Sequence, residues 1–167
     1  IMEAYEYIKK NALAYSVEYS DEKVIDKINI RQATLLTMHN AIKDLSVKPE
    51  LILVDGNDFK PYMHFERGST QYIQIPHLCV EGGDNTYTCI AAASILAKVA
   101  RDEYIIELCE EYPDLKERYS IHTNKGYGTK KHMDGIKEHG ISQWHRQSYG
   151  ICQTTQLNKV VKEEKIE

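Results

Sequence analysis

Residues 82 to 102 read G-G-D-N-T-Y-T-C-I-A-A-A-S-I-L-A-K-V-A-R-D, an acid beside two glycines followed by a long run of small and apolar residues. The run has a helical pattern, so Asp84 is expected at the mouth of a helix. Upstream, residues 51 to 56 read L-I-L-V-D-G and predict a buried strand with Asp55 at its carboxyl end. A carboxylate is costly to bury there unless a partner or a metal holds it. We interpret the two acids as a candidate metal site.

The composition is that of an ordinary globular chain. Its 167 residues are 42% hydrophobic and 28% charged, which suffices for one α/β domain with its own core. No run of about 18 apolar residues and no signal segment occurs, so we expect a cytoplasmic protein without membrane contact. The cysteines lack C-x-x-C spacing and are interpreted as buried free thiols in a reducing compartment, not disulfides or zinc ligands. They are Cys79, Cys89, Cys109 and Cys152.

The charge is unevenly distributed along the chain. The formal net charge is −4, yet residues 116 to 146 are rich in basic side chains. Such a face can hold a phosphate backbone, with an affinity that falls steeply in salt, or it can be an ordinary solvated surface. The basic residues of this stretch are Lys116, Arg118, Lys125, Lys130, Lys131, Lys137 and Arg146.

Hydrophobic periodicity and capping signals predict alternating helices and strands. Helices are expected at residues 2–17, 24–28, 33–49, 86–111, 114–119 and 129–140, and strand patterns at 51–54 and 72–80. A loop with Pro61 and Gly68 is expected between the strands. Leu36 is expected on the buried face of the helix at 33–49. Residues 1–150 are interpreted as one domain, and residues 151–167 as a charged tail that frays from Lys159.

Six segments together resemble one known family, the type 2 ribonucleases H, whose bacterial form is ribonuclease HII. The resemblance extends from Tyr5 to about Gly150. Its segments are I-D-K-I-N-I-R-Q-A-T-L-L-T-M at 25–38, L-V-D-G-N at 53–57, G-D at 83–84, I-A-A-A-S-I-L-A-K-V-A-R-D at 90–102, N-K-G-Y-G-T-K-K-H at 124–132 and H-R-Q-S-Y at 145–149.

The resemblance implies an RNase H-like α/β fold, with a mixed central sheet flanked by helices and a C-terminal helical region. It also implies an endonuclease of DNA replication and repair that cuts the RNA strand of RNA/DNA hybrids and cuts at ribonucleotides embedded in duplex DNA. The family uses two Mg²⁺ or Mn²⁺ ions held by four acids. By resemblance Asp55 and Asp84 are the third and fourth of these catalytic, metal-binding acids.

The first pair of family acids lies in a D-E-x-G-R-G segment, which is absent from this sequence. Asp21-Glu22 does not replace it, because these acids precede a helix and Lys23-Val24 follows them. We therefore expect an N-terminally truncated sheet that lacks its first strands, and a chain that is inactive or weak alone. Hydrolysis with two ions needs carboxylates that bridge and flank both cations.

By resemblance, Tyr127 contacts the ribonucleotide at the cleavage junction, where a 2′-hydroxyl distinguishes RNA from DNA. Gly126 and Gly128 let the backbone approach a ligand closely. Further candidates for phosphate contact are Lys125, Lys130, Lys131 and Arg146.

Plainer interpretations stand beside these. Asp55 can belong to an Asp-Gly turn, Asp84 can cap a helix, Tyr127 can pack on the core, and Asp102 can lie on a solvated face or support the site. A zinc site is disfavoured by the spacing of the histidines at 132, 139 and 145.

Three hypotheses follow for the whole chain, expected to be a monomer. In the first, the chain is the hydrolase, active with its missing segment or weakly active alone. In the second, it is a catalytically silent nucleic-acid-binding fragment that uses the basic face. In the third, it is a fragment that does not fold alone, because an open strand edge and an apolar face remain uncovered.

Overall fold

The structure is a computed structural model in which residues 1–164 are described. Contacts divide the chain into two compact units, one of residues 1–20 and 31–99 and the other of residues 21–30 and 100–167. Both units mix chain segments that lie far apart in the sequence. Among the described residues no helix is long and apolar enough to cross a membrane.

The first unit holds the N-terminal helix α1 (Met2–Asn11), α3 (Ile30–Lys43) and the first half of α4 (Thr88–Glu111). The expected helix at 2–17 is too long, because Ala12 turns into an extended conformation and Leu13 is 86% exposed. The helix that was expected to run to Pro49 ends at Lys43. Its Leu36 is exposed and Leu35 is buried instead, so the predicted stripe is wrong at that position.

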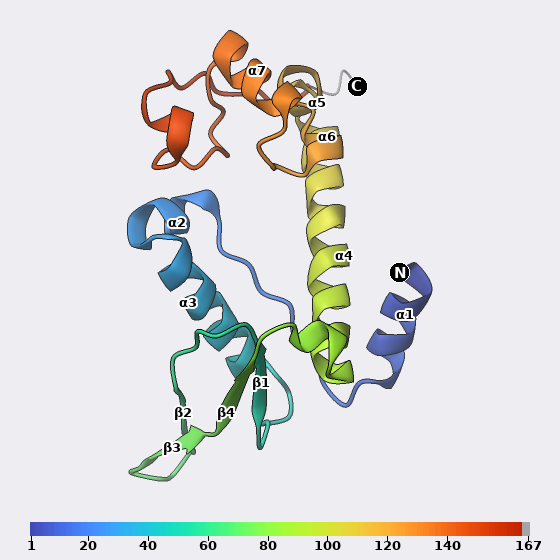
Figure 1. Ribbon diagram of the computed structural model, residues 1–167, viewed down its shortest axis with the longest axis vertical. Coiled ribbons are helices and arrows are strands. Elements are labelled where there is room, and N and C mark those ends of the chain that lie inside the picture. Colours follow the sequence, from blue (N-terminus) through green and yellow to red (C-terminus); the bar gives the residue numbers. More distant parts are fainter. Residues whose placement is uncertain (165–167) are drawn as a thin grey trace. The chain divides into compact units, whose positions relative to one another are not determined.

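The strands form two separate pairs among the described residues (Figure 1). Strand β1 (Ile52–Asp55) pairs in parallel with β4 (His77–Val80), and β2 (Tyr62–Phe65) pairs antiparallel with β3 (Tyr72–Ile75). Parallel and antiparallel pairing therefore both occur, as expected of a mixed α/β fold. The core of this unit is Ile52, Val54 and Ile75, packed against Met38 and Ile42 of α3.

Two expectations for this region are wrong. The predicted loop after residue 56 contains β2, whose alternating half-buried and exposed residues escaped notice because the segment is short. The pattern at 72–80 is two strands in different pairs rather than one. Pro76 separates them, since proline has no N–H to donate to a ladder, and its carbonyl instead accepts from the Ile52 N–H at 2.9 Å.

The second unit is helical, as the sequence predicted for the C-terminal region. Its elements are α2 (Glu22–Ile28), the second half of α4, α5 (Asp114–Tyr119), α6 (Ile121–Asn124), α7 (Lys130–His139) and the 3-10 turn η2 (Gly150–Gln153). Side-chain caps start two of them, Asp21 for α2 and Thr129 for α7. The predicted helices at 114–119 and 129–140 are confirmed, and α6 was missed.

A buried cluster built around Cys109, Leu115 and Tyr119 holds the second unit together. Close backbone packing adds to it, because a Cβ on Gly135 of α7 would lie 1.9 Å from the Arg118 carbonyl oxygen. The expected fraying from Lys159 is wrong at Val160, which is 3% exposed and whose backbone exchanges two hydrogen bonds with the side chain of Gln143. Residues 165–167 of the expected tail lie outside the described residues.

The cysteines are free thiols, as predicted, but not all are buried. Cys109 is completely buried, and burial raises its pKa. Cys89 is exposed, contrary to expectation, because in the first turn of α4 it is the neighbouring Ile90 that is buried.

Candidate functional site

Asp55 lies where the parallel pair ends. It is the last residue of β1, paired with Val80 of β4, and its side chain is exposed. One carboxylate oxygen, Oδ1, accepts a hydrogen bond from the Gly83 N–H at 3.1 Å. A simple Asp-Gly turn would need no such long-range bond, which joins the end of β1 to the turn after β4.

Asp84 lies in that turn, the 3-10 turn η1 (Gly83–Asn85). The chain enters it through Gly82 with φ of +65°, a conformation that favours glycine. Gly83 is favoured as well, because a Cβ there would lie 2.6 Å from Cδ1 of Ile90, which would have to move. The Asp84 carboxylate is exposed and makes no hydrogen bond or ion pair within residues 1–164, so it caps no helix with its side chain.

The bond between Asp55 and Gly83 brings the two predicted acids to the same edge of the β1–β4 pair. Asn57 and Glu81 lie at this edge as well, joined by a hydrogen bond of 3.3 Å from Asn57 Nδ2 to Glu81 Oε1. The sequence reasoning missed this contact. Across the described residues, no three His, Cys, Asp or Glu side chains converge as ligands for a metal ion.

The donor set fits one hard cation in part. Mg²⁺ prefers oxygen ligands, keeps several waters, and is commonly bound by one or two carboxylates together with substrate phosphates. The second oxygen of Asp55 and both oxygens of Asp84 have no protein partner in the described chain, so they are available to such an ion. Two carboxylates do not suffice to bridge and flank two ions.

A second group of predicted residues surrounds the turn at 124–128, in the other unit. Buried Asn124 shapes this turn: its Nδ2 donates to the Tyr119 carbonyl at 2.6 Å, and its Oδ1 accepts from the Gly126 N–H at 2.9 Å. Lys125 and Gly126 both have positive φ, 55° and 89°. Tyr127 is 71% exposed, so the interpretation of its ring as a core residue is wrong.

Arg101 supports this turn from α4. Its Nη2 donates to the Lys125 carbonyl at 2.7 Å, and its guanidinium lies 5.6 Å from the centre of the Tyr127 ring. The sequence pointed to the neighbouring Asp102 as a possible supporting residue. Asp102 is half-buried and makes no hydrogen bond or ion pair within the described chain, so Arg101 takes the supporting role.

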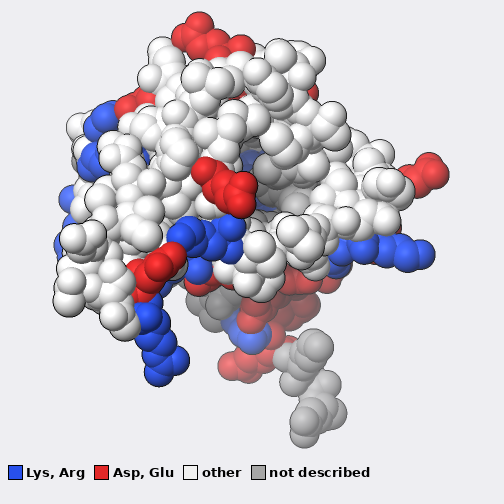
Figure 2. All heavy atoms as spheres, turned by 90° about the horizontal axis from the view of Figure 1, so that it is seen from below, with Lys and Arg blue, Asp and Glu red and all other residues white. Residues whose placement is uncertain are grey.

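The basic candidates differ in their settings. Lys130 and Lys131 are exposed in the first turn of α7, and the Lys125 side chain belongs to a half-buried residue. Arg146 stacks on Tyr149, with 3.7 Å from its guanidinium carbon to the ring centre. Figure 2 shows that acidic and basic side chains both occur on the face drawn there, in keeping with the modest net charge.

Asp26, to which no sequence pattern assigned a role, ties the segment at 25–38 to the segment at 145–149. Its carboxylate accepts from the backbone N–H groups of Gln147 and Ser148 at 2.9 and 3.0 Å, and from the Ser148 hydroxyl. Burial favours the neutral acid, but these hydrogen bonds and the charge of Arg146 outweigh it and lower the pKa of Asp26. No local sequence signal marks a contact across this separation.

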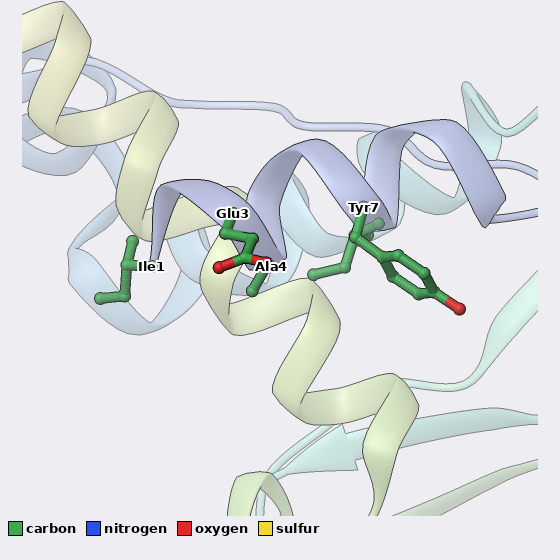
Figure 3. Close-up of a pocket in the computed structure, with 5 residues that line it drawn as sticks. Ile1, Glu3, Ala4 and Tyr7 are labelled. Carbon is green, nitrogen blue, oxygen red and sulfur yellow. The ribbon is translucent and has the colours of Figure 1, made fainter.

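Two hollows in the surface lie away from these residues. One, of about 410 Å³, is a shallow depression lined by Ile1, Glu3, Ala4, Tyr7 and Ile8 of the N-terminal helix (Figure 3). Another, of about 590 Å³, lies beside the end of α7 and residues 151–158. None of the predicted site residues lines either hollow, so the candidate sites are exposed edges and turns.

Comparison with known proteins gives the family. The family model described as Ribonuclease HII matches residues 2–152. The ribonuclease HII of Bacteroides thetaiotaomicron is 45% identical over 153 residues, which are 92% of this chain and 70% of the relative. That of Christiangramia forsetii is 44% identical over 144 residues, 86% of this chain and 66% of the relative. That of Endomicrobium trichonymphae is 41% identical over 158 residues, which are 92% of this chain and 69% of the relative.

These matches span nearly all of the α/β structure described above, and they define a nuclease of the ribonuclease H class. The chain belongs to the ribonuclease HII family. The resemblance drawn from six short segments is thereby confirmed. The family consists of divalent-metal-dependent endonucleases that act on RNA in RNA/DNA hybrids. This chain spans about two thirds of the length of these relatives.

Proposed function

We propose that the edge carrying Asp55 and Asp84 is part of a site that hydrolyses phosphodiesters, in the RNA strand of hybrids and at ribonucleotides embedded in duplex DNA. The observation that carries the proposal is the hydrogen bond from the Gly83 N–H to Asp55 Oδ1. It ties Asp55 to the residue before Asp84, so that two exposed acids from separate segments lie at one strand edge, and both match family segments.

A divalent cation at this edge would neutralise charge on the phosphate and lower the pKa of a bound water. The chain's own residues prepare the edge for that ion. Gly83 holds one oxygen of Asp55, which fixes the direction of the other. Asp84 sits on a turn that glycines at 82 and 83 favour, through the positive φ of Gly82 and the close approach of Ile90 to Gly83. We propose that a site for two ions forms only when further carboxylates, those of a D-E-x-G-R-G segment, join this pair.

Substrate contacts are assigned to the turn at 124–128 and to nearby basic residues. Exposed Tyr127 offers an aromatic face to a sugar or base, steadied by Arg101. We assign phosphate contacts to Lys125, Lys130, Lys131 and Arg146, with the Gly126 backbone close to the ligand. These contacts position a duplex without reading its sequence.

The metal proposal is tested by titrating the chain with Mn²⁺ and following the broadening of its backbone amide signals by NMR. Broadening is expected first at Gly83 and Asp84 and is expected to be lost in Asp55→Asn. Asp58→Asn is the matched control, since Asp58 is a nearby acid already paired with Arg31 at 2.7 Å. Equal broadening in Asp55→Asn would show that the ion binds elsewhere.

A second candidate function, a catalytically silent duplex binder, is favoured by the lack of a third converging acid among the described residues. It predicts salt-sensitive binding to an RNA/DNA hybrid that survives Asp55→Asn and weakens in Lys125→Ala or Lys131→Ala. Cleavage of a hybrid, by the chain alone or completed with further carboxylates, would exclude a silent binder if Asp55→Asn abolished that cleavage.

A further inference from the structure

Two buried histidines face each other behind the Tyr127 turn. His132 is 6% exposed and His145 is 9% exposed, and their Nε2 atoms lie 2.8 Å apart. Each ring also uses its other nitrogen. His132 Nδ1 lies 2.8 Å from the Tyr127 carbonyl oxygen, and His145 Nδ1 lies 2.9 Å from the Ser142 backbone nitrogen.

The two ends of this chain of contacts determine where its protons lie. A carbonyl oxygen only accepts, so His132 Nδ1 carries a proton and donates to Tyr127. A backbone N–H only donates, so His145 Nδ1 is bare and accepts from Ser142. The bare Nε2 of neutral His132 must then accept from a protonated Nε2 on His145. All bonds run in one direction, from Ser142 through both rings to Tyr127.

The surroundings favour the neutral form of His145. Burial, and next the neighbouring His132, lower the pKa of His145 to about 4. Tyr119 of α5 is a titratable side chain that packs against the pair, with its ring centre 4.7 Å from that of His145 and 6.0 Å from that of His132. Its hydroxyl donates to the Gly140 carbonyl at 2.8 Å, so it supplies no charge to the pair.

The Tyr127 carbonyl is where this relay meets the turn. Because the Tyr127 ring is largely exposed, core packing does not set its direction, which leaves the Arg101 guanidinium beside the ring and the backbone contacts of the turn. The carbonyl accepts from the Thr129 N–H at 2.8 Å as well as from His132, while Lys125 is held separately by Arg101. His132 therefore connects the Tyr127 carbonyl to the buried core, while buried Asn124 holds the beginning of the turn.

We propose that His132 and His145 are positioning residues for ribonucleotide recognition: their one-way relay from Ser142 fixes the Tyr127 carbonyl and so the direction of the Tyr127 ring. The proposal rests on the role assigned to Tyr127 under the proposed function. It concerns binding and needs no metal ion.

The test measures binding to a DNA duplex with one ribonucleotide and to the same duplex without it, in EDTA so that nothing is cleaved. The ratio of the two affinities is the readout. We expect His132→Leu to lower this ratio about fivefold, the effect of one net hydrogen bond, with the affinity for plain DNA unchanged within about twofold.

Two further variants separate positioning from stability. His132→Asn keeps an N–H near the position of Nδ1 and is expected to restore most of the ratio. Ile136→Val removes a methyl group from the buried face of the same helix and is expected to leave the ratio unchanged. A lower affinity ratio in Ile136→Val, or an unchanged affinity ratio in His132→Leu, would overturn the proposal.

Tyr127→Ala distinguishes the positioning role of the two histidines from the recognition role of Tyr127 on which it rests. If the unmodified chain shows no preference, or Tyr127→Ala leaves the preference intact, the recognition role of Tyr127 fails and the positioning role fails with it. If Tyr127→Ala lowers the ratio and His132→Leu does not, only the positioning role fails. Should His132→Leu not fold, long-range ¹H–¹⁵N spectra of the unmodified chain decide: a proton on His132 Nδ1 and on His145 Nε2 is expected, and the opposite tautomer of either ring overturns the relay.

Discussion

Acidification is expected to destabilise the second unit through His145, beginning at a pH above the range in which carboxylates ordinarily titrate. The pKa of this ring falls from an ordinary 6.5 to about 4 on folding, through burial and the neighbouring His132. Between these two pH values the unfolded chain binds a proton that the folded chain does not, so stability rises with pH. The contribution is fully present above pH 6.5 and is lost as pH falls toward 4.

The expected magnitude follows from the width of that window. Each pH unit within it is worth about 1.4 kcal/mol, so acidification from 6.5 to 4 removes roughly 2 to 3 kcal/mol of unfolding free energy. That is a large part of the stability of a small domain, which is typically about 5–15 kcal/mol. Asp26 also loses stabilisation in acid, but at lower pH, because its lowered pKa starts from 3.8.

Urea unfolding followed by tryptophan fluorescence measures this effect in the right place. Trp144 is the single tryptophan, packs on Tyr112 with ring centres 4.5 Å apart, and reports on the second unit. His145→Gln, which cannot titrate, is the control and is expected to flatten the slope between pH 4.5 and 6.5. A flat profile in the unmodified chain, or an equal slope in His145→Gln, would refute the reasoning.

Two further predictions concern packing and phosphate contact. Gly135→Ala is expected to destabilise the chain by about 1–3 kcal/mol or more despite alanine's better helix propensity, because the new Cβ would meet the Arg118 carbonyl; Gly128→Ala, which meets only Met133 at 4.0 Å, is the control, and equal melting of the two would contradict the expectation. Lys131→Ala is expected to reduce the slope of log affinity against log salt for a hybrid by about one, with Lys43→Ala unchanged; a slope that stays the same would remove Lys131 from the phosphate contacts.

The long, strongly periodic elements could be predicted from the sequence. Helix α4 and the Thr129-capped α7 carry their signals locally, in apolar spacing and in a capping residue. Strand β2 could not be predicted, because four residues offer too few repeats of the alternation. The split at Pro76 was visible as a proline within a strand pattern, but which strand each half would join depends on tertiary pairing.

The candidate sites divide in the same way. Asp55 and Asp84 could be found, because a strand-end acid and a glycine-flanked acid are local patterns that the family segments reinforce. The residues that support the Tyr127 turn could not be found in this way. Arg101 reaches it across 24 residues, and the His132–His145 contact spans 13, so neither bond leaves a mark on the local sequence.

Cleavage of a DNA duplex that carries one ribonucleotide, with Mg²⁺ or Mn²⁺, tests the central claim most directly. The chain is compared with the same chain extended at its amino end by a segment carrying D-E-x-G-R-G, each with and without Asp84→Asn. If four acids are needed, only the extended chain cleaves the duplex, and Asp84→Asn abolishes this cleavage. Cleavage by the unextended chain that Asp84→Asn abolishes would show that Asp55 and Asp84 suffice, and cleavage that survives Asp84→Asn would show that this edge is not the site.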